Sequence, residues 1–174
     1  MSLLYSDNFV GQVDLTGKDY VFMCLFAESK IVNAENLVLP ATILSEACYE
    51  EMFKYSYSLV TAPKVLPAIT LTKICYESMF NMEDIYEEGN VGHLISAPEL
   101  PATTLTTYCY YSMFQNNPSL NYIKCLATNI SATECTGNWI RGVSETGTFV
   151  KNANMTGWTH GENGIPSSWD VEEV

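Results

Sequence analysis

The sequence CYEEMF at residues 48–53 recurs as CYESMF at residues 75–80 and as CYYSMF at residues 109–114. A second motif, Leu-Pro-Ala, begins nine residues before the cysteine of each copy. Recurrence of two motifs at one fixed separation is the signature of a repeat protein, in which each unit completes its apolar core against its neighbours. The sequence therefore predicts a chain built from copies of one small structural unit.

Weaker copies flank these three and share their register. The cysteine position recurs in steps of 27, 27, 34 and 26 residues, and the proline position lengthens at the same place. One insertion, within Met82–His93, explains both changes. The cysteine position is occupied in turn by Val21, Cys48, Cys75, Cys109 and Cys135.

Each repeat has two halves with different patterns, an apolar stretch with helical spacing and a short β-prone stretch, and together they suggest the fold. Apolar residues four apart, as in Leu44, Cys48 and Met52, would share one face of a helix, which Tyr49 and Phe53 widen. Short β-prone stretches complete the units. The fold class we predict is an α/β repeat solenoid of leucine-rich-repeat type, with a short parallel sheet on one face, helices on the other, about five repeats and a C-terminal cap. The β-prone stretches are residues 31–34, 59–62, 94–97 and 120–123.

We expect a single solenoid domain over residues 1–174. Its ends differ from its middle, because terminal repeats are usually degenerate or replaced by a cap. The N-terminal part, residues 1–40, is a degenerate repeat or cap. Residues 41–127 hold three clear repeats, residues 128–150 a degenerate one, and residues 151–174 a C-terminal cap with Trp158 and Trp169.

Stacking in register predicts ladders of equivalent buried side chains. Helix axes pack about 8–10 Å apart, whereas a disulfide needs Cα atoms within about 7 Å, so the cysteines should stay reduced. Tyr49, Tyr76 and Tyr110 fall within the same apolar face, whereas Cys24 and Cys125 lie off the ladder. The ladder residues are Cys48, Cys75, Cys109 and Cys135, then Met52, Met79 and Met113, then Phe53, Phe80 and Phe114.

The combined motifs Leu-Pro-Ala-Thr, Cys-Tyr-x-x-Met-Phe and Ser-Leu-x-x-Ala-Pro resemble the BspA-like leucine-rich-repeat surface proteins of gut anaerobic bacteria. The closing segment, residues 147–169, is similar to the end of such arrays. The resemblance implies a cell-surface or secreted protein with a role in adhesion. It also implies no enzymatic activity and no catalytic residues. The chain departs from the family in its lengthened repeat and in lacking an export signal near Met1.

Catalytic and metal-binding motifs are missing from the sequence. G-x-S-x-G, H-E-x-x-H, the P-loop and G-x-G-x-x-G do not occur, and the fragment His160-Gly161-Glu162 lacks the P-C-x-x-C of zinc deaminases. No C-x-x-C and no histidine cluster favours zinc. We therefore predict no catalytic residue, no cofactor and no metal.

Charge and hydropathy restrict the partners. The net charge of −12 would repel a phosphate backbone, so nucleic acid is not expected. No apolar run approaches the roughly 18–20 residues that span a bilayer, so this segment should not insert into a membrane.

Two regions are candidate binding surfaces. One is a polar column on the predicted strands, Asn33, Thr61, Ser96 and Tyr122, which we expect on the exposed sheet surface unless it is merely solvated. On the opposite face we expect their neighbours, which are Val32, Val60, Ile95 and Asn121, together with Ala34, Ala62, Ala97 and Ile123.

The inserted loop is the other candidate. It carries Glu83, Asp84, Glu87 and Glu88 ahead of His93. Insertions in repeat arrays fall on one face, often the binding face. A calcium site would need several converging oxygens, and the D-x-D-x-D-G spacing is absent, so a solvated acidic loop is the main alternative.

The function that these patterns favour is a non-enzymatic recognition or adhesion module for a host or environmental protein or glycan. The alternative is a structural spacer or assembly component, such as a stalk or a phage tail accessory part. The sequence leaves the ligand and the oligomeric state open.

Overall fold

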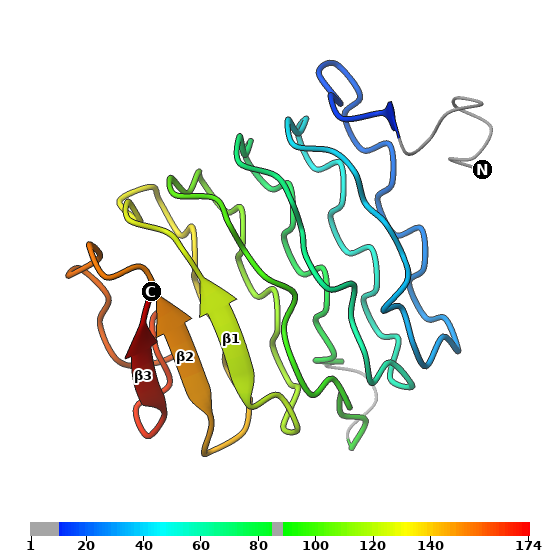
Figure 1. Ribbon diagram of the computed structural model, residues 1–174. Coiled ribbons are helices and arrows are strands. Elements are labelled where there is room, and N and C mark those ends of the chain that lie inside the picture. The colour runs from blue at the N-terminus through cyan, green and yellow to red at the C-terminus, as the bar shows by residue number, and fades with distance from the viewer. Residues whose placement is uncertain (1–10, 85–88) are drawn as a thin grey trace.

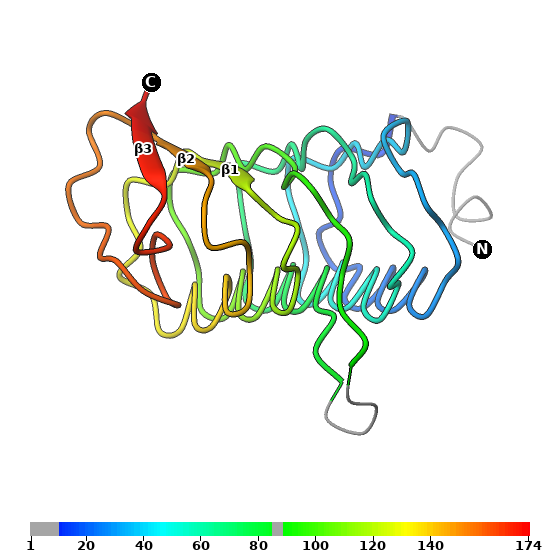
Figure 2. The same ribbon diagram turned by 90° about the horizontal axis from the view of Figure 1, so that it is seen from below.

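The computed structural model describes residues 11–84 and 89–174, and they form one continuous stack of coils (Figure 1). Each coil makes one circuit and returns beside its predecessor, so that residues one repeat apart become neighbours. Figure 2 shows the stack turned by 90°, with the strands along one side and a row of tight zigzag turns along the opposite side. We call these the strand side and the turn side.

The strand side is a parallel ladder. Its three strands are β1 (Tyr122–Cys125), β2 (Thr148–Lys151) and β3 (Asp170–Glu173), and they pair in the order β1-β2-β3. Isolated parallel bridges extend the ladder towards the N-terminus. These bridges join Asn33 to Thr61, Thr61 to Ser96, and Ser96 to Tyr122.

The predicted fold class, an α/β repeat solenoid with helices on the other face, is wrong, because the described residues contain no α-helix and only three short strands. The segments that follow each Leu-Pro-Ala motif are instead successive β-turns. In the second coil Ala47, Glu51 and Tyr55 all have positive φ, between 52° and 58°. A left-handed residue at every fourth position ends a right-handed helix before it completes a turn.

This left-handed pattern recurs throughout the turn side. Thirteen non-glycine residues of the described chain have positive φ, and all of them belong to it. Besides the three of the second coil, they are Tyr20, Cys24, Glu28, Ile74, Ser78, Tyr108, Ser112, Asn116, Glu134 and Asn138.

Backbone hydrogen bonds on the turn side explain why no helix is needed. The N–H of Glu50 donates within its own coil, to the carbonyl of Ala47 (3.2 Å), whereas that of Glu51 donates to the carbonyl of Glu77 in the next coil (2.9 Å). This alternation leaves every N–H from residue 47 to residue 56 with a backbone partner. Since the neighbouring coil supplies half of these partners, the backbone is satisfied without a helix.

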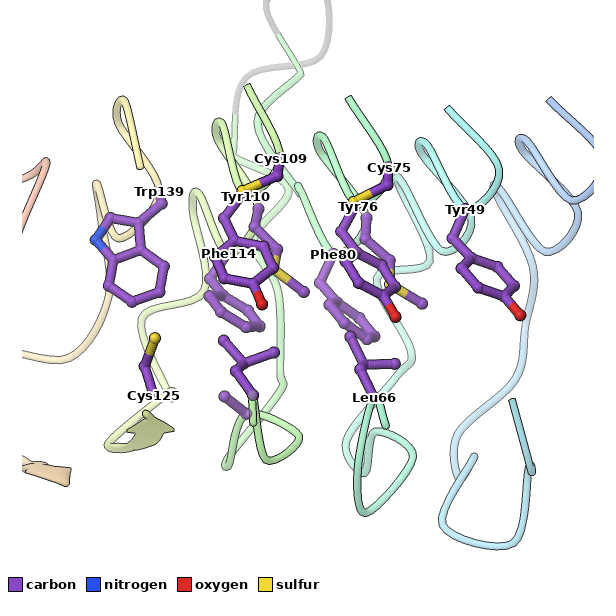
Figure 3. Packing of buried hydrophobic residues seen from close by; sticks show 14 of the residues in the cluster. Tyr49, Leu66, Cys75, Tyr76, Phe80, Cys109, Tyr110, Phe114, Cys125 and Trp139 are labelled. Carbon is purple, nitrogen blue, oxygen red and sulfur yellow. The ribbon is translucent and has the colours of Figure 1, made fainter. Parts of the chain in front are cut away.

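Aromatic rings fill the space between the two sides in continuous columns (Figure 3). Phe80 stacks between Phe53 and Phe114, with centroid distances of 5.4 and 5.7 Å. A second column contains Tyr49 and Tyr76, whose rings lie 5.6 Å apart and 7° from parallel. The predicted cysteine, methionine and phenylalanine ladders all lie in this core.

Residues after β2 close the C-terminal end of the stack. Trp158 stacks on Trp139 at 5.6 Å and ends the aromatic column. The indole N–H of Trp139 donates to the carbonyl of Gly164 (2.9 Å), and the side chain of Asn163 accepts the backbone N–H of Asn138 (2.7 Å). These residues therefore supply the acceptors that a further coil would provide.

All six cysteines are free thiols, but helix spacing is not the reason. Coils pack at the strand spacing of about 4.8 Å, which lies within the Cα range of a disulfide. Equivalent cysteines such as Cys75 and Cys109 project in the same direction (Figure 3), so their Cβ atoms stay about one coil spacing apart, beyond the roughly 3.8 Å typical of a disulfide. Burial also raises the pKa of Cys48 and Cys109 to about 12, which keeps these thiols protonated.

Candidate functional site

A shallow groove of about 500 Å³ on the strand side crosses the coils of Thr61, Ser96 and Tyr122, and Glu35 of the preceding coil borders it. Thr61, Ser96 and Tyr122 line it, one from each coil, and the parallel bridges hold them in register. Ala62 and Ala97 lie buried beneath it. The groove exists because small residues occupy two coils while the large ring of Tyr122 rises from the third.

The polar column of the sequence analysis follows this groove. Tyr122 is 37% exposed, Ser96 is exposed and Thr61 is half-buried. The fourth member, Asn33, lies in register with Thr61 but does not line the groove. Its side-chain oxygen accepts the backbone N–H of Glu35 at 2.7 Å, so Asn33 shapes the local turn.

Strict alternation of the strand side chains is a wrong prediction. Val32 is 55% exposed and Ile95 50%, although both were expected to face away from the polar column. The N–H groups of Val60 and Thr61 both donate to one carbonyl, that of Val32, at 2.8 and 3.3 Å. This shared acceptor departs from a regular ladder at Val60 and Thr61. In the coils on either side two consecutive residues are exposed, Val32 with Asn33 and Ile95 with Ser96.

The four positions that follow the outward pair behave as expected for a core. Three of these side chains are alanine and the fourth is the larger isoleucine of β1, and they fill the space below the outward-facing pair. The buried members are Ala34, Ala62, Ala97 and Ile123, whereas Asn121 is exposed like Val32 and Ile95.

Paired charges form one border of the groove. The ammonium of Lys64 lies 3.1 Å from a carboxylate oxygen of Glu35, and that of Lys124 lies 3.0 Å from Glu99. Two glutamates and two lysines are the charged residues of the lining, so its formal charge is zero. A neutral groove on a chain of net charge −12 is a local departure from the composition.

The sequence analysis missed these four residues. They stand two or three positions after the members of the polar column, and their charge alternates in sign from coil to coil. That alternation at nearly equivalent positions of the repeat is the signal that could have found them. In chain order they are Glu35, Lys64, Glu99 and Lys124.

Several backbone groups beneath the groove are already used by the stack. The N–H of Ile95 donates to the carbonyl of Val60 (3.2 Å), and that of Ala97 donates to the carbonyl of Tyr122 (2.9 Å). Within the described residues, the hydroxyl groups of Thr61 and Tyr122 make no hydrogen bond. A ligand in the groove would therefore meet side chains rather than strand backbone.

Only part of the acidic loop can be placed. Glu87 and Glu88 lie outside the described residues, and His93 is exposed. Glu83 pairs with Arg141 at 2.6 Å. Asp84 accepts a hydrogen bond from the hydroxyl of Tyr57 at 3.4 Å. Over residues 11–84 and 89–174 no group of three or more histidine, cysteine, aspartate or glutamate side chains could hold a metal ion.

Comparison with known proteins adds no relative: no protein-family model, no curated protein and no solved structure matches this chain. In the part of the chain that the structure describes, no helix has the length and apolarity to cross a bilayer. The groove must therefore be interpreted from its own geometry and chemistry.

Proposed function

We propose that this chain is a non-enzymatic recognition module that binds an extended partner along the groove of the strand side. One observation carries the proposal: Thr61, Ser96 and Tyr122 stand in register over three coils and line one continuous groove. Repeat proteins characteristically use such long, regular surfaces to hold extended partners.

The composition of the groove supports binding over simple solvation. Ile95 is half exposed, and with the ring of Tyr122 it offers apolar area that water solvates poorly. Apolar surface beside a few directed polar groups is typical of ligand sites. The resemblance to surface repeat proteins favours a place at the cell surface or outside the cell, where the partner would be a host or environmental molecule.

Binding to arrays of extracellular proteins and of glycans tests this function. The labelled wild-type chain should bind members of at least one array, and Tyr122→Ala should lose that binding, because the substitution removes the wall of the groove. Tyr20→Ala is the matched control, since Tyr20 is 53% exposed but lies on the turn side. Absence of any binder, or equal binding by the wild type and Tyr122→Ala, would contradict the proposal.

A further inference from the structure

We propose that the ligand of the groove is an uncharged oligosaccharide that lies along the stack with one sugar ring against Tyr122. This inference rests on the proposed function and deepens it, because it assigns a chemical class to the partner. Three properties of the lining support it: cancelled charge, a row of hydroxyl groups of which only that of Ser96 has a hydrogen-bond partner among the described residues, the carbonyl of Ala97 at 3.3 Å, and an exposed aromatic ring.

Charge comes first. Lys64 and Lys124 already have carboxylate partners at 3.1 and 3.0 Å. An anionic ligand would have to compete with Glu35 and Glu99 for these ammonium groups, against the field of a chain of net charge −12. A cationic ligand would have to displace the same lysines from the glutamates. A neutral ligand leaves both pairs intact and can still accept from the lysines and donate to the glutamates.

Hydrogen-bonding chemistry separates a sugar from a peptide. Every residue of a bound peptide brings a backbone N–H and a carbonyl that need partners once buried. The N–H groups of Ile95 and Ala97 below the groove cannot supply them, since both already donate to neighbouring coils. Sugar hydroxyls both donate and accept, as do the hydroxyls of Thr61, Ser96 and Tyr122 that line the groove.

The ring of Tyr122 accounts for the apolar part of the site. A tyrosine combines a flat apolar face with a polar hydroxyl at its tip. A pyranose ring has the matching arrangement, with C–H groups on its face and hydroxyls around its rim. Ile95 and Val60 add apolar contacts beside it.

The spacing of the coils indicates the direction in which the oligosaccharide lies. Equivalent side chains repeat about every 4.8 Å along the stack, so Thr61, Ser96 and Tyr122 present polar groups over about 10 Å. A chain of linked sugars laid along this line meets one hydroxyl-bearing side chain per coil. A ligand laid across the stack would meet only one of them.

The test uses an array of neutral glycans, acidic glycans and peptides, probed with the full chain. Wild type should bind neutral glycans, and Tyr122→Ala should weaken this binding about tenfold or more, the effect of roughly 1.4 kcal/mol. Tyr122→Phe should keep most of the affinity, because the ring remains. Thr61→Val removes one hydroxyl at nearly constant shape and should weaken binding about threefold to tenfold.

A charge variant sharpens the assignment. Glu99→Gln leaves Lys124 without its carboxylate partner, so this variant should gain binding to acidic glycans that the wild type lacks. Tyr20→Ala again serves as the control and should bind like the wild type. Thermal unfolding of each variant verifies that the fold is intact.

The outcomes distinguish the two proposals. Binding only to peptides or acidic glycans, if it depends on Tyr122, would overturn the oligosaccharide assignment while the recognition function stands. No binding to any array would overturn both. Neutral-glycan binding that is insensitive to Tyr122→Ala and Thr61→Val would place the sugar outside the groove and overturn both proposals.

Discussion

The turn side and the strand side of the same coils are built on opposite principles. On the turn side the backbone bonds are continuous and the side chains beneath repeat with little change, as Phe53, Phe80 and Phe114 illustrate. On the strand side most coils contribute only isolated bridges, and equivalent positions hold threonine, serine and tyrosine. The turn side therefore determines the stack, and the strand side is free to vary in chemistry.

The largest loss of stability should come from removing a ring from the repeated aromatic columns beneath the turn side. Phe80→Ala removes a fully buried ring from between two stacked neighbours, and we expect a loss of about 3–5 kcal/mol in the free energy of unfolding. Denaturant titration measures it, with Ile69→Ala as the exposed apolar control. A loss below about 1 kcal/mol for Phe80→Ala would show that coils stack without the ring column.

A pair of glycine substitutions distinguishes turns from a helix. Glu134 is exposed with φ of 49°, so Glu134→Gly should stabilise the chain by about 0.5–1 kcal/mol through relief of left-handed strain. Thr133, its exposed neighbour, lacks a positive φ, and Thr133→Gly should cost about 0.5–1 kcal/mol. In a helix both variants would lose stability, so a destabilised Glu134→Gly would contradict the turn geometry.

Acidic residues on the turn side should make stability depend on pH. Burial, together with the carboxylates of Glu50 and Glu51, raises the pKa of Glu77 to about 7, against about 4.3 for an unfolded glutamate. Between these values the folded chain holds more protons than the unfolded one, so stability falls as the pH rises through this window. Glu77→Gln should therefore raise the melting temperature at pH 8 relative to the wild type and flatten the fall from pH 5 to pH 8.

Thermal melts at the two pH values check this effect, which should be modest because Glu77 is only half-buried. Glu145→Gln is the control. Glu145 is exposed and lies apart from Glu50, Glu51 and Glu77, so its substitution should leave the pH dependence of stability unchanged. An unaltered fall in Glu77→Gln would mean that other groups cause it.

The smallest effect on stability should come from the strand side. Tyr122→Ala changes a partly exposed side chain on which no ring of the described residues stacks, and we expect its free energy of unfolding within about 0.5 kcal/mol of the wild type. The same variant should lose ligand binding. A large loss of stability would remove the distinction between a structural turn side and a variable strand side.

The register of the coils could be predicted from sequence because it depends on motif spacing alone. The bridges from Asn33 through Thr61 and Ser96 to Tyr122 join the positions that the repeat alignment places together. Burial of the ladders follows from the same alignment. This part of the fold required no knowledge of the local backbone.

Local backbone geometry was beyond the reach of the apolar pattern. Leu44, Cys48 and Met52 recur every four residues, which suits a helix of 3.6 residues per turn over a short stretch and suits a series of four-residue turns equally well. The difference lies in where the N–H groups find acceptors, and a neighbouring coil is not visible in local sequence. The exposure of Val32 and Ile95 escaped prediction similarly, because these residues lie outside the three regular strands and do not follow their alternation.

Among the described residues, the backbone hydrogen bonds between coils on the turn side run from one coil to the following one, along the axis of the stack. Tension applied to the two ends therefore loads successive interfaces in series, and each yields separately. We expect the chain to unravel coil by coil in a force experiment, with each event releasing about 27 residues, or roughly 90 Å of extended chain. The repeat of 34 residues should give one longer step, so that the sequence of step lengths would report the length of each repeat.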